Sequence, residues 1–332
     1  MARKAGAGRR RRQGEPAQGA GGRTPTMGRW LLLALGALPL AACELPPVPL
    51  PDGPPVLVVD AVLVADQLVQ TVLLHESLQN GRARAVLGAH VVVRDSASGD
   101  SLVFLEQASA EPCLVEGLPR SLPPQPVGCY VGTRAGFFVQ PGRVYRLEVR
   151  TADGRRAWGR TRVPGRFTLV SPQPGPACTV RPDSQAALVW TRADSALVYL
   201  ADAELRGLEP ALAPLGIQLP EPIKLLGLSA QDTDTILVVP RDLGLFQRLE
   251  YPQPLWERLA RGLPAGAEAR VVVAALERNV LNAIRGGAFN PSGPVRASSV
   301  GGDAVGVFGA YTRVRLTLYA DAPPRRAPAC RP

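Results

Sequence analysis

The sequence has little of the chemistry that most enzyme active sites use. Its 332 residues include only two histidines, His75 and His90, and both fall within strand patterns. Cys-x-x-Cys and Gly-x-Ser-x-Gly patterns are absent, and no serine stands three residues before Lys224, the only lysine after residue 26. Ser-His-Asp and Cys-His enzymes need a histidine beside the nucleophile, while zinc and thioredoxin-like sites need paired cysteines. The sequence therefore argues against these enzyme classes and predicts no catalytic residue.

A basic excess is also absent outside the first residues of the chain. The formal net charge is +10, but residues 1–42 hold eight of the 38 basic residues and one of the 28 acidic residues. Without that segment the net charge is +3, so a nucleic-acid partner is not predicted. Residues 1–26 have no apolar period and are predicted to be disordered, as an over-extended translation start before Met27. The alternative is a long basic signal region with a twin-arginine motif within residues 9–12.

Segments that resemble ligand-binding loops lack the features that those loops need. A phosphate-binding loop opens a helix, whereas the glycine-rich segment 301–309 leads into a strand pattern. We expect its glycines to let Val307 and Phe308 pack closely at a bend. Residues 231–235 offer two carboxylates without the flanking helices and bidentate glutamate of a calcium loop, and residues 290–294 are typical of a turn. No metal and no cofactor is predicted.

The most informative segment runs from Met27 to Cys43. A basic start at Arg29 leads into the apolar run 30–38, and the segment ends in Leu-Ala-Ala-Cys. The apolar core of about ten residues is too short to span a bilayer, which needs roughly twenty. This pattern is typical of a secretory signal that ends in a lipobox, so residues 27–42 are predicted to be a lipoprotein signal peptide and Cys43 to be lipidated. An ordinary signal peptide with a cysteine nearby is the alternative.

Residues 43–55 are predicted to form a tether, because six prolines lie between residues 44 and 55. Such a segment forms an extended, semi-rigid spacer. The expected location is the cell envelope, lipid-anchored, with the outer membrane preferred. Glu44 is not the aspartate that is associated with inner-membrane retention in some bacteria.

The remaining cysteines fit an oxidising compartment. With Cys43 lipidated, four cysteines remain, which allow three pairings. The sequence favours Cys113–Cys129, which closes a short proline-rich loop, and Cys178–Cys330, which ties the chain end to the start of a second domain. Four free thiols are the alternative.

From Val56 onward the sequence reads as short β-strands separated by turns. Residues 56–64 and 70–74 are rich in β-branched residues, and apolar and charged residues alternate from Tyr145 to Arg150. Turn signals separate these runs, and no helical period occurs. An antiparallel β-sandwich is therefore predicted over residues 56–164.

A second sandwich is predicted after a linker. Five prolines between residues 163 and 182 indicate a linker over residues 165–182. Strand patterns that would place Trp190 and Tyr199 in a core then predict a fibronectin-like sandwich over residues 183–322, followed by a tail at residues 323–332.

One short helix is predicted within this second sandwich. Leu255, Trp256 and Leu259 lie at helical spacing, so we expect a helix from Pro254 to Arg261 with Gly262 as its cap. The predicted fold class is mainly β, with two antiparallel immunoglobulin- or fibronectin-like β-sandwich domains.

The last predicted strand, Thr312–Tyr319, carries two cations on one face. Arg313 and Arg315 share an outward face near Tyr319. A solvated surface is expected there, with an anion-binding patch as the alternative.

Several of these segments together resemble a known family. The lipobox, VLVVDAVLV, GAHVVVRDSASGD, PGRVYRLEVRTADGR and GGDAVGVFGAYTRVRL look like a family of uncharacterised envelope lipoproteins of Bacteroidota and related phyla, which has a domain of unknown function. The resemblance covers nearly the whole mature chain. Members are often encoded beside TonB-dependent outer-membrane receptors, which implies such a receptor as a partner. The insert with Cys113 and Cys129 and the tail ending near Cys330 depart from the family pattern, and the resemblance implies no catalytic residue.

The sequence therefore predicts a non-enzymatic, membrane-anchored envelope lipoprotein that acts as an accessory or ligand-presenting partner of an outer-membrane receptor. A glycan- or surface-binding adhesin of the same architecture is the alternative. A hydrolase built on two carboxylates stays open, because such a pair forms in space and leaves no fixed spacing in sequence.

Overall fold

A computed structural model describes most of the chain after the predicted tether. The described residues are 54–65, 67–79, 82–114, 126–173, 175–229, 235–244, 247–285, 297–321 and 326–331. All of them belong to one compact unit, residues 52–332. The predicted signal peptide, Cys43 and most of the tether lie outside the described residues.

The described residues are mainly β-strand, so the predicted fold class is confirmed. The strands are β1 (Leu57–Val64), β2 (Gln70–Gln79), β3 (Arg82–Ala85), β4 (His90–Asp95), β5 (Ser101–Glu106), β6 (Gly128–Gly132), β7 (Val144–Arg150), β8 (Arg156–Arg162), β9 (Leu169–Ser171), β10 (Ala177–Val180), β11 (Ala186–Trp190), β12 (Val198–Arg206), β13 (Ile223–Leu228), β14 (Ile236–Val239), β15 (Glu268–Leu276), β16 (Val300–Gly302) and β17 (Ala304–Ala320). The helices are η1 (Glu111–Cys113), α2 (Glu209–Leu212), η2 (Ala213–Leu215), α3 (Gln253–Ala260) and α4 (Arg278–Arg285).

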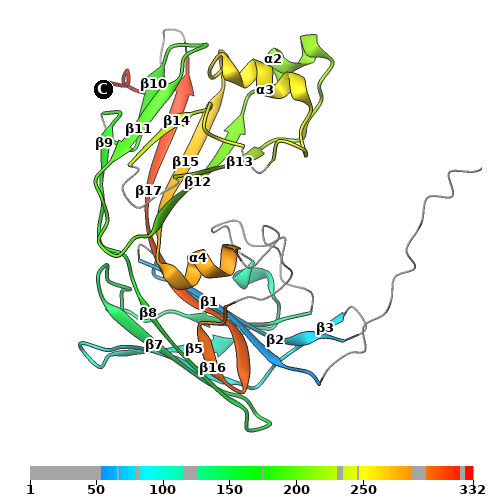
Figure 1. Ribbon diagram of the computed structural model, residues 1–332, viewed down its shortest axis with the longest axis vertical. Coiled ribbons are helices and arrows are strands. Elements are labelled where there is room, and N and C mark those ends of the chain that lie inside the picture. The colour runs from blue at the N-terminus through cyan, green and yellow to red at the C-terminus, as the bar shows by residue number, and fades with distance from the viewer. Residues whose placement is uncertain are drawn as a thin grey trace, which may run out of the picture. The chain divides into compact units, whose positions relative to one another are not determined.

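The strands form two sheets within the described part of the chain. The larger sheet has the order β13-β12-β15-β17-β1-β2-β6-β5-β4-β7-β8-β16, with β3 beside β2 and β10 beside β17, and the smaller has the order β14-β11-β9 (Figure 1). Most neighbours are antiparallel, as the sequence predicts. Two pairs are parallel, because β1 and β10 each align with β17. A parallel pair needs a long crossover connection, and short-range turn signals carry no information about it.

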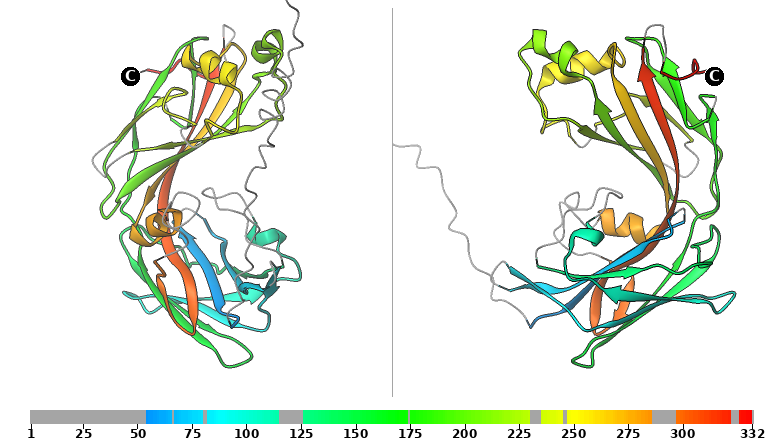
Figure 2. Two further views of the ribbon diagram at one scale, coloured as in Figure 1. Left: turned by 45° about the vertical axis from the view of Figure 1, so that its right-hand side comes forward. Right: turned by 180° about the vertical axis from the view of Figure 1, so that it is seen from behind.

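Strand β17 connects the two halves of the larger sheet. Its first half pairs with β1, from Leu57↔Ala304 to Val64↔Tyr311, and its second half pairs with β15, from Leu276↔Tyr311 to Glu268↔Tyr319. The strand is 17 residues long, so the predicted strand Thr312–Tyr319 is its second half. Figure 2 shows β17 extending through the molecule in both views.

Glycine permits a close strand contact at the start of β17. Gly306 has φ +133°, and a Cβ at this position would lie 2.0 Å from the carbonyl oxygen of Val59 on β1. Two residues later, Phe308 is fully buried. The glycine-rich segment thus brings Phe308 into the core, as expected, while Val307 is half-buried.

Two hydrophobic cores lie along β17, one against each half of the strand. The first core joins β1, β2, β4 to β8 and the first half of β17, with Tyr130, Tyr145 and Phe308 as its largest fully buried members. The second joins β10 to β15, the helices α2 and α3 and the second half of β17, around Trp190 and Tyr199, the core aromatics predicted for the second sandwich. Burial of such apolar surface is the main favourable term in the folding free energy.

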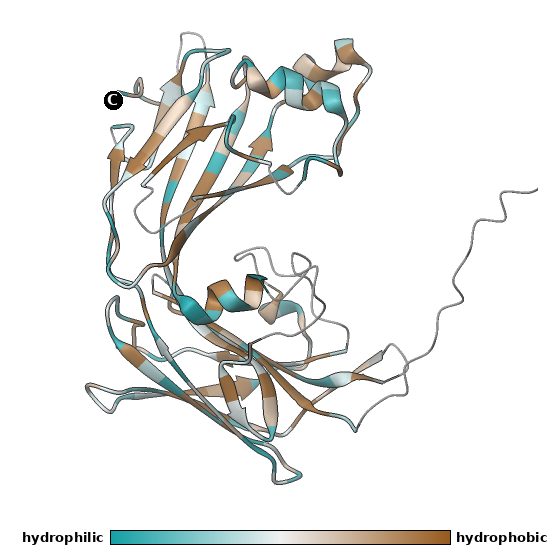
Figure 3. Cartoon of the chain, viewed as in Figure 1, coloured by the Kyte–Doolittle hydropathy of each residue, from teal (hydrophilic) through white to brown (hydrophobic). Residues whose placement is uncertain are grey.

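The helix α3 is confirmed within one residue of its predicted bounds. Helix α4 was not predicted, although Val280, Leu281 and Ile284 form an apolar stripe at helical spacing. Its stripe covers β12, β15 and β17, and Figure 3 shows hydrophobic residues, in brown, along the strands beside it. Residues 165–182, predicted as a linker, contain β9 and β10, which pair with β11 and β17. The domain boundaries themselves stay a prediction.

Candidate functional site

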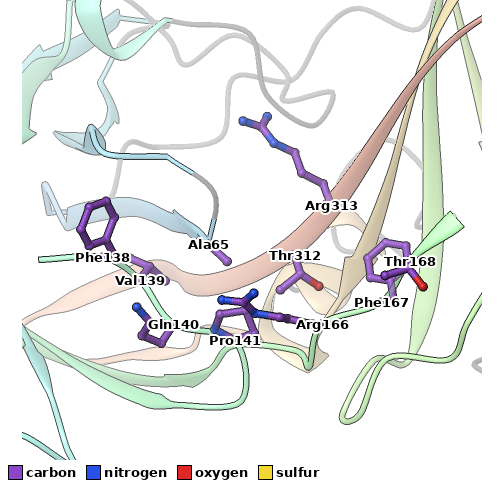
Figure 4. A pocket seen from close by; sticks show the side chains of 10 residues that line it. All are labelled: Ala65, Phe138, Val139, Gln140, Pro141, Arg166, Phe167, Thr168, Thr312 and Arg313. Carbon is purple, nitrogen blue, oxygen red and sulfur yellow. The ribbon is translucent and has the colours of Figure 1, made fainter. Parts of the chain in front are cut away.

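A cavity of about 470 Å³ lies beside the middle of β17. Its walls come from the loop before β7, the segment between β8 and β9, and β17 itself (Figure 4). The lining residues are Ala65, Phe138, Val139, Gln140, Pro141, Arg166, Phe167, Thr168, Thr312 and Arg313. In Figure 4, Phe138 lies at one end of the cavity and Phe167 at the other. The volume is within the range of small-molecule binding sites.

A buried tyrosine holds the first wall in place. The hydroxyl of Tyr145 accepts a hydrogen bond from the backbone nitrogen of Gln140 at 2.8 Å and donates one to the carbonyl of Phe138 at 3.4 Å. Burial raises the pKa of Tyr145, so the hydroxyl stays protonated and keeps its donor at neutral pH. The loop is therefore fixed with the ring of Phe138 about half exposed beside the cavity.

The opposite wall is fastened to the second core. The backbone nitrogen of Gly165 donates to the carbonyl of Asp194 at 2.8 Å, and the carbonyl of Gly165 accepts from the hydroxyl of Thr312 at 3.1 Å. Phe167 packs edge-on against Tyr199, with ring centroids 5.5 Å apart. These contacts hold the segment that carries Arg166 and Thr168 against β17.

The charged groups in the lining are both cations. Arg166 is exposed and Arg313 is half-buried, and the ten lining residues include no carboxylate, imidazole or thiol. Guanidinium groups bind carboxylate and phosphate through paired hydrogen bonds. The cavity thus has the chemistry to bind an anionic ligand, with Phe138 available for its apolar part, and its lining has no group suited to general acid–base catalysis.

A buried carboxylate with a raised pKa has a structural role. Glu277 is buried at the start of α4, and burial raises its pKa. Its oxygens accept hydrogen bonds from the backbone nitrogens of Asn279 at 2.8 Å, Val280 at 3.0 Å and Ala310 at 3.3 Å. The first two satisfy donors at the helix N-terminus, so Glu277 caps α4 and ties it to β17.

The two disulfides favoured by the sequence are both present. Cys113 bonds Cys129 across a sequence separation of 16, and Cys178 bonds Cys330 across 152. The first joins η1 to β6, and the second joins the last described residues to β10.

The two histidines and the lysine that the sequence singled out lie on three different strands, β2, β4 and β13. His75 is buried on β2 with Nδ1 2.7 Å from the carbonyl of Glu76, and His90 is exposed on β4. Lys224 pairs with Glu204 at 3.5 Å. Arg313 lines the cavity, whereas Arg315 is exposed and Tyr319 is covered by the guanidinium of Arg326 at 4.4 Å.

Sequence reasoning missed Phe138, Arg166 and Trp158. Trp158 is 57% exposed on the outer face of β8, beside a second hollow of about 650 Å³. The sequence signal that could have identified Trp158 is its position in β8, where it is an aromatic residue at an outward position of an alternating strand.

The predicted loops at residues 231–234 and 290–294 lie outside the described residues. Within the described ranges, no group of three or more potential metal ligands occurs, and no helix is long and apolar enough to cross a membrane.

Taken together, the fold and the cavity define a mainly β protein with a cation-lined, ligand-sized site. Residues 46–191 match the family described as "Domain of unknown function (DUF4249)", in agreement with the predicted resemblance to a family with a domain of unknown function. No curated protein matches the chain.

Three solved structures are among those with detectable similarity to this chain. The FN1–FN3 domains of chicken CNTN1 share 13% identity (TM-score 0.18; 82% of this chain, 69% of that chain). Trypsin-activated α2-macroglobulin from Escherichia coli shares 9% (0.20; 80% and 16%), and the IG1+IG2 domains of DIP-gamma share 10% (0.18; 79% and 95%). These TM-scores are too low to bear on function.

Proposed function

We propose that this protein is a lipid-anchored envelope protein that binds an anionic ligand and presents it to an outer-membrane receptor. The observation that carries the proposal is the sequence Leu-Ala-Ala-Cys at residues 40–43, placed after a short apolar run and before a proline-rich segment. A diacylglyceryl group on Cys43 would hold the folded residues near a bilayer, and residues 44–55 would provide the slack.

The structure supports binding over chemistry. Both disulfides agree with an oxidising compartment outside the cytosol. The lining of the cavity beside β17 includes Arg166, Arg313 and Phe138, and it has no acid or base for turnover. A receptor that imports small anions is a suitable partner for a site with this chemistry, and the family resemblance implies a receptor of the TonB-dependent class.

Anchoring is tested by mass spectrometry of the mature N-terminal peptide. We expect a diacylglyceryl-modified Cys43 and a protein that fractionates with the outer membrane, whereas Cys43→Ser releases the protein from the membrane fraction. An unmodified Cys43 in a cytosolic protein contradicts the proposal.

Presentation to a receptor is tested by cross-linking in intact cells followed by purification of the anchored protein. An outer-membrane receptor is expected among the cross-linked partners. The variants Arg166→Ala and Phe138→Ala alter only cavity side chains, so they should stay anchored and folded while ligand transfer falls. Repeated absence of any receptor contradicts this part of the proposal and leaves the anchoring intact.

A glycan- or surface-binding adhesin is the second candidate, because one observation favours it. Trp158 presents 57% of its surface to solvent on an otherwise charged sheet face. An exposed aromatic ring with polar neighbours is a suitable platform for a sugar ring. Glycan-array binding that depends on Trp158 would favour this candidate over the first.

A further inference from the structure

The outer face of the sheet formed by β4, β7 and β8 is crowded with cations. Side chains alternate along each strand, so one face points to the first core and the other to solvent. The exposed outer positions hold six arginines: Arg94, Arg146, Arg150, Arg156, Arg160 and Arg162. Glu148 is the carboxylate among the outward positions of these three strands. We refer to this surface as the arginine face.

The strand register places like charges directly opposite one another. In the strand register, Arg146 lies directly opposite Arg94 on β4 and directly opposite Arg160 on β8, so three arginines form one row. Arg150 pairs with Arg156 and with His90 in a second row. Each row spans two strand spacings, or about 10 Å. Like charges at such positions destabilise a sheet, so this arrangement is unfavourable for folding by itself.

Internal pairing compensates little of this charge. Arg94 lies 3.8 Å from Glu148, and both side chains are about half exposed. Among the described residues, the other five arginines of the face have no carboxylate within ion-pair distance. By contrast, Arg155 in the adjacent turn pairs with Glu76 and Asp153 at 3.1 and 2.7 Å. The unpaired cations are thus available to an anion from outside.

Trp158 lies between the two rows in a fixed position. It is opposite Glu148 on β7 and opposite Gly301 on β16. A Cβ at Gly301 would lie 3.1 Å from the indole Nε1, and one at Gly302 would lie 2.6 Å from Cζ3. The glycines therefore let the indole rest on the backbone of β16, while the residue as a whole stays 57% exposed. This gives a rigid aromatic platform with arginines on both sides.

The hollow beside Trp158 has several polar groups in its lining. Its volume is about 650 Å³, and Arg146, Glu148, Arg160, Asn279 and Ser298 are among its lining residues. The amide of Asn279 donates to the carbonyl of Arg160 at 2.9 Å, which fixes that edge. Hydroxyl, amide and carboxylate groups around an aromatic ring match the hydroxyls and the apolar face of a sugar. A membrane-inserted surface would instead be expected to place several apolar side chains around Trp158.

We infer that the arginine face binds an acidic polysaccharide, with one sugar ring on Trp158 and its carboxylate or sulfate groups on the arginine rows. The inference rests on the glycan-binding candidate proposed above and names its site and ligand class. The cavity beside β17 has no part in it. Charge complementarity selects an acidic polymer, and Trp158 with its polar hollow selects a saccharide over a lipid surface.

The test uses the full-length protein and five immobilised probes. The probes are polygalacturonate, dextran sulfate, neutral dextran, and vesicles of phosphatidylcholine with and without phosphatidylglycerol. We expect binding to one or both acidic polysaccharides, with affinity that falls as salt rises. The double variant Arg146→Ser/Arg160→Ser should bind about tenfold or more weakly, and Trp158→Ala should lose affinity with an unchanged salt dependence.

Arg206→Ser is the matched control, since this arginine lies on β12, away from the arginine face, and pairs with Glu204. It should bind like the wild type, and near-ultraviolet circular dichroism should show that all variants keep the native fold.

The remaining outcomes separate the inference from the function on which it rests. Equal binding of neutral dextran that depends on Trp158 overturns the acidic ligand class and leaves glycan binding intact. Binding only to vesicles that contain phosphatidylglycerol, or to no probe at all, overturns both the inference and the glycan-binding candidate. Acidic binding that the arginine variants do not change overturns the assignment to this face.

Discussion

The sheet is open to solvent at β7 and covered on both sides at β12. Along β7, buried and exposed residues alternate, with Arg146, Glu148 and Arg150 outward. Along the first half of β12, consecutive residues are buried. Val198 and Leu200 pack toward α4, whereas the neighbouring Tyr199 and Ala201 belong to the second core.

This difference between β7 and β12 shows which sheet faces must be apolar for the protein to fold and which need not be. The covered strands exclude charge from their buried positions, and an apolar side chain there contributes on both faces of the sheet. Strands such as β7 form the same backbone hydrogen bonds with only one apolar face. The identity of their outward residues therefore matters little for folding. An outer face that gathers arginines with few partners is therefore better explained by a ligand than by stability.

The largest expected contrast is between the two disulfides. Removing Cys178–Cys330 with alanine at both positions should lower the free energy of unfolding by about 5 kcal/mol, and removing Cys113–Cys129 by about 3 kcal/mol. The reason is loop size, because the bonds close separations of 152 and 16 residues. Urea unfolding of the two double variants measures the difference. A larger loss for Cys113–Cys129 would show that fixing residues 326–331 through Cys330 stabilises the fold less than the loop size implies.

Truncation on the covered sheet should cost far more than truncation on the open sheet. Leu200→Ala removes a side chain that is 2% exposed and should lower the free energy of unfolding by about 2–5 kcal/mol. Val103→Ala, at 46% exposure on β5, should change it by about 0.5 kcal/mol or less. Equal losses in denaturant titrations would remove the distinction between the two regions.

The cover over β12 depends on the cap of helix α4. Glu277→Ala leaves the backbone nitrogens of Asn279 and Val280 without their acceptor and should cost about 0.5–2 kcal/mol. Thermal unfolding measures the loss. A variant as stable as the wild type would show that α4 covers the sheet without this cap.

The same residue should give the stability a pH dependence. Burial raises the pKa of Glu277 above its unfolded value of 4.5. A carboxyl whose pKa is higher in the folded state binds more protons there, so its contribution is complete below the unfolded pKa and is lost as pH rises through the folded pKa. Glu277→Gln does not titrate, so its stability relative to the wild type should increase from pH 4 toward pH 8. A difference that is constant over this range contradicts the shift.

The smallest expected effect is a gain in stability on the open sheet. Arg146→Gln relieves the repulsion with Arg94 and Arg160 and should raise the free energy of unfolding by a few tenths of a kcal/mol at low salt. The gain should vanish near 1 M salt, where the screening length is about 3 Å. Arg206→Gln removes a paired arginine on β12 and should give no gain. A loss for Arg146→Gln would mean that the arginine rows stabilise the fold.

Local patterns predicted the elements that local chemistry decides. The alternation in β7, the helix α3 and the disulfide pairings follow from spacing and composition, and each is present. The family match over residues 46–191 includes three of the five segments that carry the resemblance, whereas the lipobox and GGDAVGVFGAYTRVRL lie outside it. The lipidation of Cys43 and the receptor stay predictions.

Non-local geometry accounts for what the sequence did not predict. The pairing of β1 with β17 joins residues about 250 positions apart in the chain, and no turn signal encodes such a contact. Helix α4 is short, and its cap comes from Glu277, whose role depends on contact with Ala310. The cavity gathers residues from four separate segments, and the arginine rows appear only once the register of three strands is known.

The parallel pairing of β1 with β17 has a mechanical consequence. Tension that enters at Val56 and leaves through the C-terminal end of β17 pulls the two strands in opposite directions along their common axis. Eight aligned residue pairs then resist together, from Leu57↔Ala304 to Val64↔Tyr311, and must slide as a group before either strand can leave. An antiparallel hairpin loaded at its open end would instead separate one pair at a time. A pull on the chain before β1 is therefore opposed by a shear geometry of eight residue pairs.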